Sequence, residues 1–523
     1  MRREGLVRQK TAIKRARPVA ARPSNDWDEP KVKQGALRAL AHTSEGLAAL
    51  ALICFYLAVM SGHLYSIDGL LLYRQSLSLA YSHSIHLTPP ILWGATITDS
   101  KYGLGLSLLY LPGLILWAWL APYIPQSGSN PYNWAMFYQD PLYTVAAAPI
   151  QILIAAASAY LLARLLREIG FGRAEALWGM ALYGLASPAI VYAKADWAQP
   201  LAGLCWIAAL YGAVRFRRTG TRSDLGIMAL AVGYAVVTRP VEGTLLLSAV
   251  LAILAPRRRL MLWPRGVRQA MGAVVVGYSL GLALTLVVNW GRYGSPLNFG
   301  YAGEGWTAPL RITLPAVLVS PGWGIIWEFP AILLAPLGVA YLFRRGQGRI
   351  GVIMAGLIVA QLLNTAAWHD WAGGWNWGLR LFVPALPITA VLATAGMAGL
   401  PDRMRPWLPA FLFMAGVAWA VPCVLTNLLG GYAGMISGAQ IYVFSNYPPI
   451  GAWQFMHSWR DLDILWVRSS QGSGNTSLIL GVLLLVSATV LARRAYRLAG
   501  SDADTGRENA VPFPHRREGH RPG

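Results

Sequence analysis

The chain has few charged residues for its length and few cysteines. Only 13% of its 523 residues are Asp, Glu, Lys or Arg, whereas 55% are hydrophobic, and the mean hydropathy is +0.43. This composition excludes an ordinary soluble domain, which needs a larger polar surface. The cysteines, Cys54, Cys205 and Cys423, all lie in apolar stretches. They therefore indicate neither a disulfide framework nor a cysteine-based metal site.

Acidic residues are also scarce, with 23 Asp and Glu against 44 Lys and Arg, which gives a formal net charge of +21. In a soluble protein this balance indicates nucleic-acid binding, but here the arginines cluster in short loops between apolar runs. The positive-inside rule explains that distribution, so we expect membrane lipids and no nucleic acid as partners. Because the runs recur along the chain, the sequence predicts an all-α, polytopic transmembrane helical bundle of about 12–14 spans.

The domain organisation follows from these runs. Residues 1–40 are basic and lack an apolar segment before a cleavage site, so they predict a disordered cytoplasmic tail rather than a signal peptide. Residues 41–498 form the expected transmembrane domain, and 499–523 a second disordered cytoplasmic tail. The expected external loops are 61–101, 291–321, 368–380 and 430–476.

The early spans leave a conflict in the number of crossings. We expect a first span at about Gly46–Met60 and a second at about Tyr102–Pro122, followed by the long apolar stretch Trp134–Leu166. Three simple spans place Arg164–Arg173 outside, against the positive-inside rule. We therefore expect Trp134–Leu166 to hold two short spans broken near Pro149, with a re-entrant second segment as the alternative. The later expected spans are Glu175–Tyr192, Trp197–Val214, Leu225–Thr238, Val241–Ala255, Ala270–Trp290, Gly322–Phe343, Ile350–Ala367, Leu381–Leu400, Trp407–Leu428 and Leu478–Ala492.

The first external loop carries a carboxylate at the membrane surface. Asp68 follows the first span, and Leu70–Tyr81 has apolar residues at helical spacing, which predicts a helix in the membrane interface. A carboxylate at that depth can meet the head group of a lipid-linked substrate. The alternative, favoured by residue type alone, is that Asp68 caps this helix, and capping does not exclude catalysis.

Two tight connections place further charges on the same side. The Tyr192–Pro200 hairpin carries Lys194, Asp196 and Gln199, and Lys194 there can equally be a snorkelling anchor. Arg239 precedes Pro240 in an otherwise apolar stretch, so it needs water, an acid or a phosphate. Glu242 is its nearest acidic candidate, and this pairing and a phosphate role stay equal alternatives.

A tryptophan-rich loop precedes one of the later spans. It contains Trp371, Trp375 and Trp377 among glycines and ends at Arg380. Indole faces stack on sugar rings, and a guanidinium can grip a phosphate, although an aromatic belt with a positive anchor explains the composition equally well. The pair His369–Asp370 is a weak metal signal. Loop 430–476 is too long for a simple connection, and we expect a lid or an acceptor-side cap.

In these features the chain resembles the GT-C superfamily of membrane glycosyltransferases, in its protein-mannosyltransferase-like branch that uses polyprenyl-phosphate sugars. The resemblance spans most of residues 46–380. It rests on Asp68 with the interfacial helix, Lys101-Tyr102-Gly103-Leu104-Gly105, the Tyr192–Leu201 hairpin, Thr238-Arg239-Pro240, Gly294-Ser295-Pro296, and Gly373-Gly374 through Arg380-Leu381 with Pro384 and Pro387.

The resemblance implies an inverting glycosyltransferase that moves a sugar from a polyprenyl-phosphate donor to an external acceptor hydroxyl on a glycan, lipid or protein. Asp68 matches the family's general base, and Arg380, Lys101 and Arg239 are candidates to hold the leaving phosphate. The other expected substrate-binding residues are Tyr102, Asp196, Gln199, Trp371, Trp375 and Trp377.

The chain departs from the family at two positions. Gly69 stands where relatives often carry a second acid, and Gln199 where they often carry Asp or Glu. No cofactor is therefore certain, and a divalent metal is possible but unsupported. The alternative functions are a transporter or flippase of lipid-linked sugars and a catalytically inactive GT-C relative.

Overall fold

The computed structural model describes residues 43–506 except 94, 121–141, 257–264, 375, 428–442, 445–446, 455 and 474, all within one compact unit that begins at Leu40. The expected all-α class is confirmed, since the regular structure of the described part is helical apart from a small antiparallel hairpin of β1 (Ile91–Trp93) and β2 (Ala95–Ile97). The basic tail 1–40 lies outside the described residues. Six helices are long and apolar enough to cross a membrane, and the chain is a multi-pass membrane protein. They are Tyr143–Glu168, Gly266–Tyr293, Gly348–Ala367, Arg380–Ala398, Leu408–Leu425 and Thr476–Gly500.

The helices follow most of the expected spans. In chain order the main ones are α2 (Ser44–Val59), α3 (Ile67–Tyr81), α4 (Gly105–Leu120), the π-helical turn η2 (Tyr143–Ala147), α5 (Ala148–Glu168), α6 (Arg173–Leu185), α7 (Ala189–Tyr192), α8 (Gln199–Thr219), α9 (Arg222–Thr238), α10 (Pro240–Leu254), α11 (Arg265–Tyr293), α12 (Leu310–Val319), α13 (Ile325–Glu328), η3 (Pro330–Leu334), α14 (Ala335–Arg344), α15 (Gly348–Ala367), η4 (Arg380–Ala385), α16 (Leu386–Ala398), α17 (Leu408–Leu425), α18 (Pro448–Gln454), η8 (Trp459–Asp461), α19 (Leu465–Ser473) and α20 (Thr476–Gly506). The last helix therefore continues beyond 498, where a disordered tail was expected.

Several basic loops meet at one end of the bundle, which we call the basic end (Arg167, Arg217, Arg218, Arg345, Arg349). Arg217 donates to the carbonyl of Ile253 (2.5 Å), and Arg218 pairs with Glu168 (3.2 Å). Gln347 donates to the carbonyl of Ile169 (3.0 Å). The helices that leave this end lead to the opposite one, which we call the cavity end because Asp68, Arg239 and Arg380 meet there.

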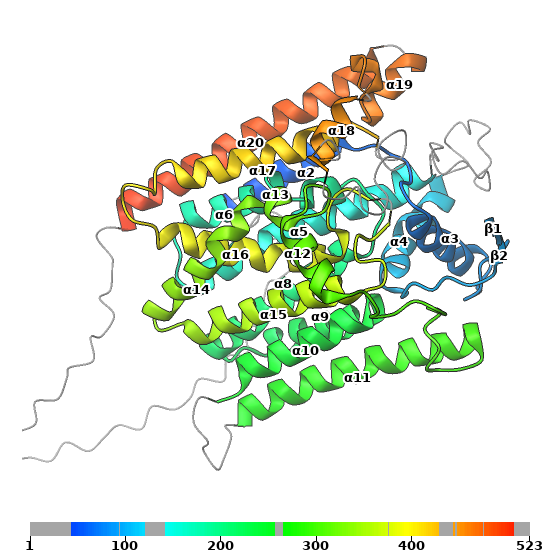
Figure 1. The fold of residues 1–523 in the computed structure, drawn as a ribbon, viewed down its shortest axis with the longest axis horizontal. Helices are drawn as coiled ribbons and strands as arrows, with labels where there is room; N and C mark the ends of the chain where they lie inside the picture. Colours follow the sequence, from blue (N-terminus) through cyan, green and yellow to red (C-terminus); the bar gives the residue numbers. More distant parts are fainter. Residues whose placement is uncertain are drawn as a thin grey trace, which may run out of the picture. The chain divides into compact units, whose positions relative to one another are not determined.

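Helix α4 lies at the cavity end instead of crossing to the basic end. Figure 1 shows α3, α4 and the β-hairpin together at one end of the helices. The start of α4 packs on Thr238, where a Cβ on Gly105 would collide, and its far half contacts Tyr81, whose hydroxyl donates to the carbonyl of Leu114 (3.1 Å). The expectation of a second span at Tyr102–Pro122 is therefore wrong. Helix α4 is as apolar as a membrane span, but it packs on α3 and η2.

Helix α5 resolves the conflict in the number of crossings. Helical structure is continuous from Tyr143 to Glu168, so the expectation of two short spans broken near Pro149 is also wrong. Pro149 is the second residue of α5, directly after the π-helical turn η2, and the helix continues through it. With α4 kept at the cavity end, α2 leads there and α5 returns to the basic end, which brings Arg167 beside Glu45 (3.7 Å) as the arginine distribution requires.

Helix α3 forms where expected, but its polar side chains face the protein. Arg74, Gln75 and Ser78 are buried, whereas Tyr81 on the supposed apolar face is exposed. Arg74 donates to the carbonyl of Pro89 (2.9 Å), and Gln75 to that of Ile85 (2.9 Å). The polar residues therefore hold the following loop in place, and the amphipathic pattern did not identify the exposed side of the helix.

A buried junction joins the C-terminal segment to the first loop. The Asp463 carboxylate accepts hydrogen bonds from His63 (2.8 Å), Tyr65, Lys194 (3.2 Å) and Arg468. Burial alone would raise the pKa of Asp463, but Lys194, His63 and Arg468 hold it well below its usual value. Lys194 is buried, so its interpretation as a snorkelling anchor is wrong. We call this group the Asp463 junction.

Candidate active site

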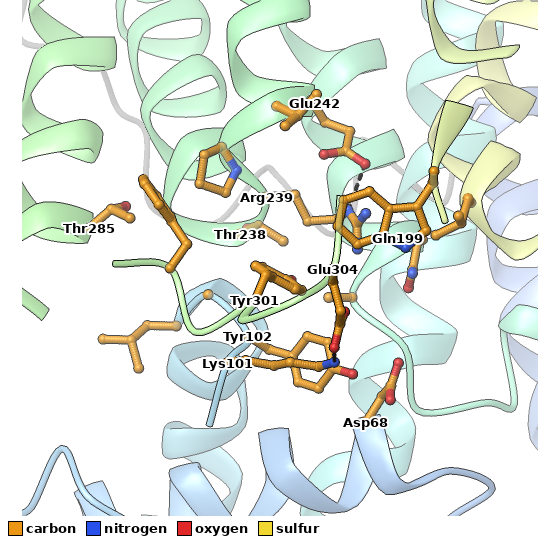
Figure 2. A pocket seen from close by; sticks show the side chains of 18 of the residues that line it. Asp68, Lys101, Tyr102, Gln199, Thr238, Arg239, Glu242, Thr285, Tyr301 and Glu304 are labelled. Atoms are coloured by element: carbon orange, nitrogen blue, oxygen red, sulfur yellow. Dashed lines mark hydrogen bonds and ion pairs between the residues drawn. The ribbon is translucent and has the colours of Figure 1, made fainter. Parts of the chain in front are cut away.

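A cavity of about 940 Å³ opens at the cavity end. Its wall is built from α3, the segment before α4, the start of α8, the α9–α10 junction, the end of α11 and the loops before α12 and η4 (Figure 2). Six of the residues expected from the sequence line it: Asp68, Lys101, Tyr102, Gln199, Arg239 and Arg380.

Asp68 projects from the first turn of α3 and forms an ion pair with Arg380. Ser66 is the N-cap, because its hydroxyl accepts the N–H of Gly69 (2.9 Å), so the interpretation of Asp68 as the cap is wrong. Asp68 is thereby left available, and its Oδ2 accepts from Nη1 of Arg380 at 2.6 Å across 312 residues of sequence. The two side chains are 11% and 15% exposed, so the pair faces the cavity while most of it is desolvated.

Glu328 holds the backbone that presents Arg380. Its Oε2 accepts the N–H of Leu379 (2.8 Å), and a Cβ on Gly378, which has φ +66, would collide with the same carboxyl group. Burial raises the pKa of Glu328 to about 8, although the Leu379 N–H opposes this shift. Glu328 was not among the residues expected from the sequence, although it stands as an acid inside an apolar run, Ile325–Phe329.

The cavity is electrically balanced, although the sequence led us to expect an excess of cations around one acid. Lys101 pairs with Glu304, and Arg239 with Glu242 at 2.6 Å, as the dashed lines of Figure 2 mark. Arg292, which the sequence analysis also missed, donates to the carbonyls of Ser100 (2.8 Å) and Tyr102 (2.9 Å) and to Gln75 (2.9 Å). The lining residues include four basic side chains, Lys101, Arg239, Arg292 and Arg380, and four acidic ones, Asp68, Glu242, Glu304 and Asp370.

Asp196 is absent from the cavity wall and instead supports the turn before Asp68. Its Oδ2 accepts the N–H groups of Tyr65 (3.2 Å) and Ser66 (3.4 Å). Burial raises its pKa to about 7, and Oδ1 has no hydrogen-bond partner within the described residues. A Cβ on Gly69 would lie only 1.7 Å from Oδ2. The carboxylate of Asp196 thus fills the space of a side chain at position 69, which explains why glycine stands there.

The tryptophans nominated from the sequence do not line the cavity where the structure describes them. Trp377 is 1% exposed, and its carbonyl accepts from the hydroxyl of Tyr192 (2.8 Å). Trp371 packs edge-on against Trp323, with ring centres 6.4 Å apart, and Trp375 lies outside the described residues. The cavity wall instead contains Trp306 and Trp368.

One wall of the cavity is apolar. It is formed by Leu284 and Val288 of α11, by Val241 at the start of α10, and by Leu297 and Phe299 of the next loop. Helix α11 is among the apolar helices and is mostly exposed, with 22% of its apolar window buried. Carboxylates, cations and a hydrocarbon-like surface therefore share one space, which suits an amphiphilic ligand with an anionic head.

The site offers little for a metal ion. Within the described part of the chain, no group of three or more His, Cys, Asp or Glu side chains is placed to hold one. His369 is instead 3.5 Å from Glu304, the partner of Lys101.

No family model and no curated protein matches the sequence. Among solved structures, the fold is similar to ArnT from Cupriavidus metallidurans bound to undecaprenyl phosphate, at 16% identity and a TM-score of 0.49 over 87% of this chain and 75% of that one. It is also similar to the Archaeoglobus fulgidus oligosaccharyltransferase in the apo form, at 11% identity and a TM-score of 0.41 over 87% of this chain and 60% of that one.

Proposed function

We propose that this protein is an inverting membrane glycosyltransferase of GT-C type, which transfers a sugar from a polyprenyl-phosphate donor to an acceptor hydroxyl on the external side of the membrane. The observation that carries the proposal is the ion pair of Asp68 with Arg380 inside the 940 Å³ cavity. A candidate base and a candidate phosphate ligand, far apart in sequence, there face a common space with an apolar wall.

Asp68 has the properties of a general base for a hydroxyl. Its carboxylate is held on a helix, has low exposure and faces the cavity. In the proposed step the proton of the acceptor hydroxyl passes to Asp68, and the acceptor oxygen bonds to the anomeric carbon from the face opposite the phosphate. The bond from that carbon to the phosphate oxygen breaks, and its electron pair leaves with the lipid phosphate.

A donor phosphate that binds Arg380 also changes the ion pair of Arg380 with Asp68. Arg380 cannot hold a phosphate in its full fork while Nη1 is bonded to Asp68, and the buried Nε of Arg380 has no partner within the described residues. A phosphate that takes over the guanidinium makes bidentate, charge-assisted bonds. The carboxylate of Asp68 is then free of the guanidinium and open to the hydroxyl of an acceptor. Binding of the donor thus prepares the base.

The apolar wall accounts for the lipid part of the donor. Val241 lies on α10, and Leu284 and Val288 lie on α11, and both of these helices are apolar. An isoprenoid chain can lie against them while its phosphate reaches Arg380 and Arg239. A soluble sugar nucleotide makes no use of this wall, which favours a lipid-linked donor over a nucleotide-linked one.

The test compares wild type with Asp68→Asn and Arg380→Gln, purified in lipid nanodiscs. Asp402→Asn is the matched control, because Asp402 forms an ordinary ion pair with Arg405 (3.2 Å) on the surface. Binding of radiolabelled polyprenyl-phosphate sugars and transfer to membrane-extract acceptors are measured separately. We expect Asp68→Asn to bind the donor and lose transfer by about a hundredfold or more. Arg380→Gln should lose donor binding, and the control should keep both.

Undiminished transfer by Asp68→Asn would remove the proposed base. Movement of lipid-linked sugar between the leaflets of vesicles, without any transfer and unaffected by Asp68→Asn, would instead establish the transporter or flippase alternative.

A further inference from the structure

A second polar region of the cavity lies where two loops pair. The backbone N–H of His369 donates to the carbonyl of Gly305 (2.8 Å), and the backbone N–H of Ala308 donates to the carbonyl of Ala367 (3.0 Å). This short antiparallel contact brings Trp306 beside Trp368, with ring centres 5.6 Å apart. Asp370 follows one residue after the paired His369. Trp306 and Asp370 therefore stand next to the same backbone pairing, and both line the cavity.

Trp306 is both fixed and exposed. Its indole N–H donates to Oδ1 of Asn364 (2.8 Å), and the ring of Trp368 packs against it at 78°. These contacts set the orientation of the ring, yet the residue is 56% exposed. An apolar ring held in one orientation beside a cavity is a stacking surface, because little conformational entropy is lost when a ligand covers it.

Asp370 is the one acidic lining residue without an ion pair within the described residues. Asp68, Glu242 and Glu304 are each paired with a cation, whereas the side chain of Asp370 takes part in no ion pair or hydrogen bond there. Its Oδ2 lies near Gly374, where a Cβ would come to 3.3 Å. A half-buried carboxylate with open acceptor positions is suited to hydroxyl groups, and it repels a phosphate.

We propose that Trp306 and Asp370 form a subsite for a pyranose ring of a carbohydrate acceptor, with stacking on Trp306 and hydrogen bonds from vicinal hydroxyls to Asp370. This inference rests on the proposed function and narrows its acceptor to a glycan or glycolipid. The negative charge of Asp370 assigns the subsite to the acceptor, because the donor carries its phosphate toward Arg380. The amide nitrogen of Asn364, whose oxygen already orients Trp306, is available as a further donor to the sugar.

The test measures binding of methyl pyranosides to the purified full chain in nanodiscs, by saturation-transfer NMR. Trp306→Ala and Asp370→Asn are compared with wild type, and Trp306→Phe is included because it keeps a stacking ring. Trp407→Ala is the matched control, since Trp407 is similarly exposed at 54% and likewise donates its indole N–H, to the carbonyl of Arg403 (3.0 Å). Sorbitol, an open-chain polyol, tests whether a ring is required.

We expect Trp306→Ala to weaken pyranoside binding about tenfold, and Asp370→Asn by a similar factor. Trp306→Phe should keep most of the affinity, and Trp407→Ala should equal wild type. Equal affinity in Trp306→Ala and wild type, or equal binding of sorbitol, overturns the subsite.

Binding of polyprenyl phosphate alone is measured in parallel with wild type and Arg380→Gln. If polyprenyl phosphate binds through Arg380 but Trp306→Ala does not change pyranoside binding, the subsite is refuted and the proposed donor is not. Trp306-dependent pyranoside binding without carrier binding defeats the proposed donor instead, so the two failures are distinguishable.

Discussion

Gly69→Ala is the sharpest structural test of how Asp68 is held. The new methyl group would lie 1.7 Å from Oδ2 of Asp196, so the carboxylate must move and leave the N–H groups of Tyr65 and Ser66. Loss of two hydrogen bonds, each about 0.5–1.5 kcal/mol, combines with an overpacking cost of about 1–3 kcal/mol. Relaxation recovers part of this sum, so we expect a loss of about 2–4 kcal/mol of stability.

The assay is thermal unfolding in detergent, followed by transfer activity at a temperature where the variant is folded. Gly272→Ala is the matched control, because Gly272 is also helical and its Cβ meets nothing within 4 Å. That change should be neutral or stabilising by up to about 1 kcal/mol. The double variant Gly69→Ala with Asp196→Ala removes the collision, so its loss should be smaller than the sum of the single losses by about 1–3 kcal/mol. Additive losses, or a fully stable and active Gly69→Ala, would refute the reasoning.

Two further predictions concern buried carboxyl groups. Glu328→Gln keeps an acceptor for the N–H of Leu379, so it should bind donor like wild type, whereas Glu328→Leu should bind at least about tenfold more weakly. For Asp196, the folded pKa of about 7 exceeds the ordinary 3.8, so the folded state holds the extra proton and stability falls as pH rises between these values. The total is at most about 4 kcal/mol, and a melting curve of Asp196→Asn that keeps the wild-type pH slope would contradict this assignment.

The sequence identified much of the cavity because charges are rare in an apolar chain. Asp68, Arg239 and Arg380 stood out against their surroundings, and the structure brings all three to one cavity. The pairing of Arg239 with Glu242, one of the two alternatives weighed from the sequence, is present. The partner of Lys101 was not predictable, since Glu304 lies 203 residues away and nothing local links them. Trp306 was missed because a single exposed indole looks like any interfacial tryptophan until its neighbours are known.

The wrong predictions about the fold have a common physical origin. Residues 105–120 are as apolar as a span, and composition alone does not distinguish a helix that crosses a bilayer from one that packs at its surface. The apolar spacing of α3 predicted a helix in the membrane interface, whereas its polar residues Arg74 and Gln75 bind backbone carbonyls of the loop that follows. In both segments long-range packing decided the outcome.

The Asp463 junction has a consequence for how the chain matures. The carboxylate of Asp463 lies 269 residues after Lys194 and 400 residues after His63, and both side chains bind it. During synthesis the chain must be made as far as Asp463 before Lys194 and His63 can form these hydrogen bonds. The contacts that tie His63 and Tyr65, just before Asp68, to Asp463 can therefore form only after the C-terminal part of the chain has been made.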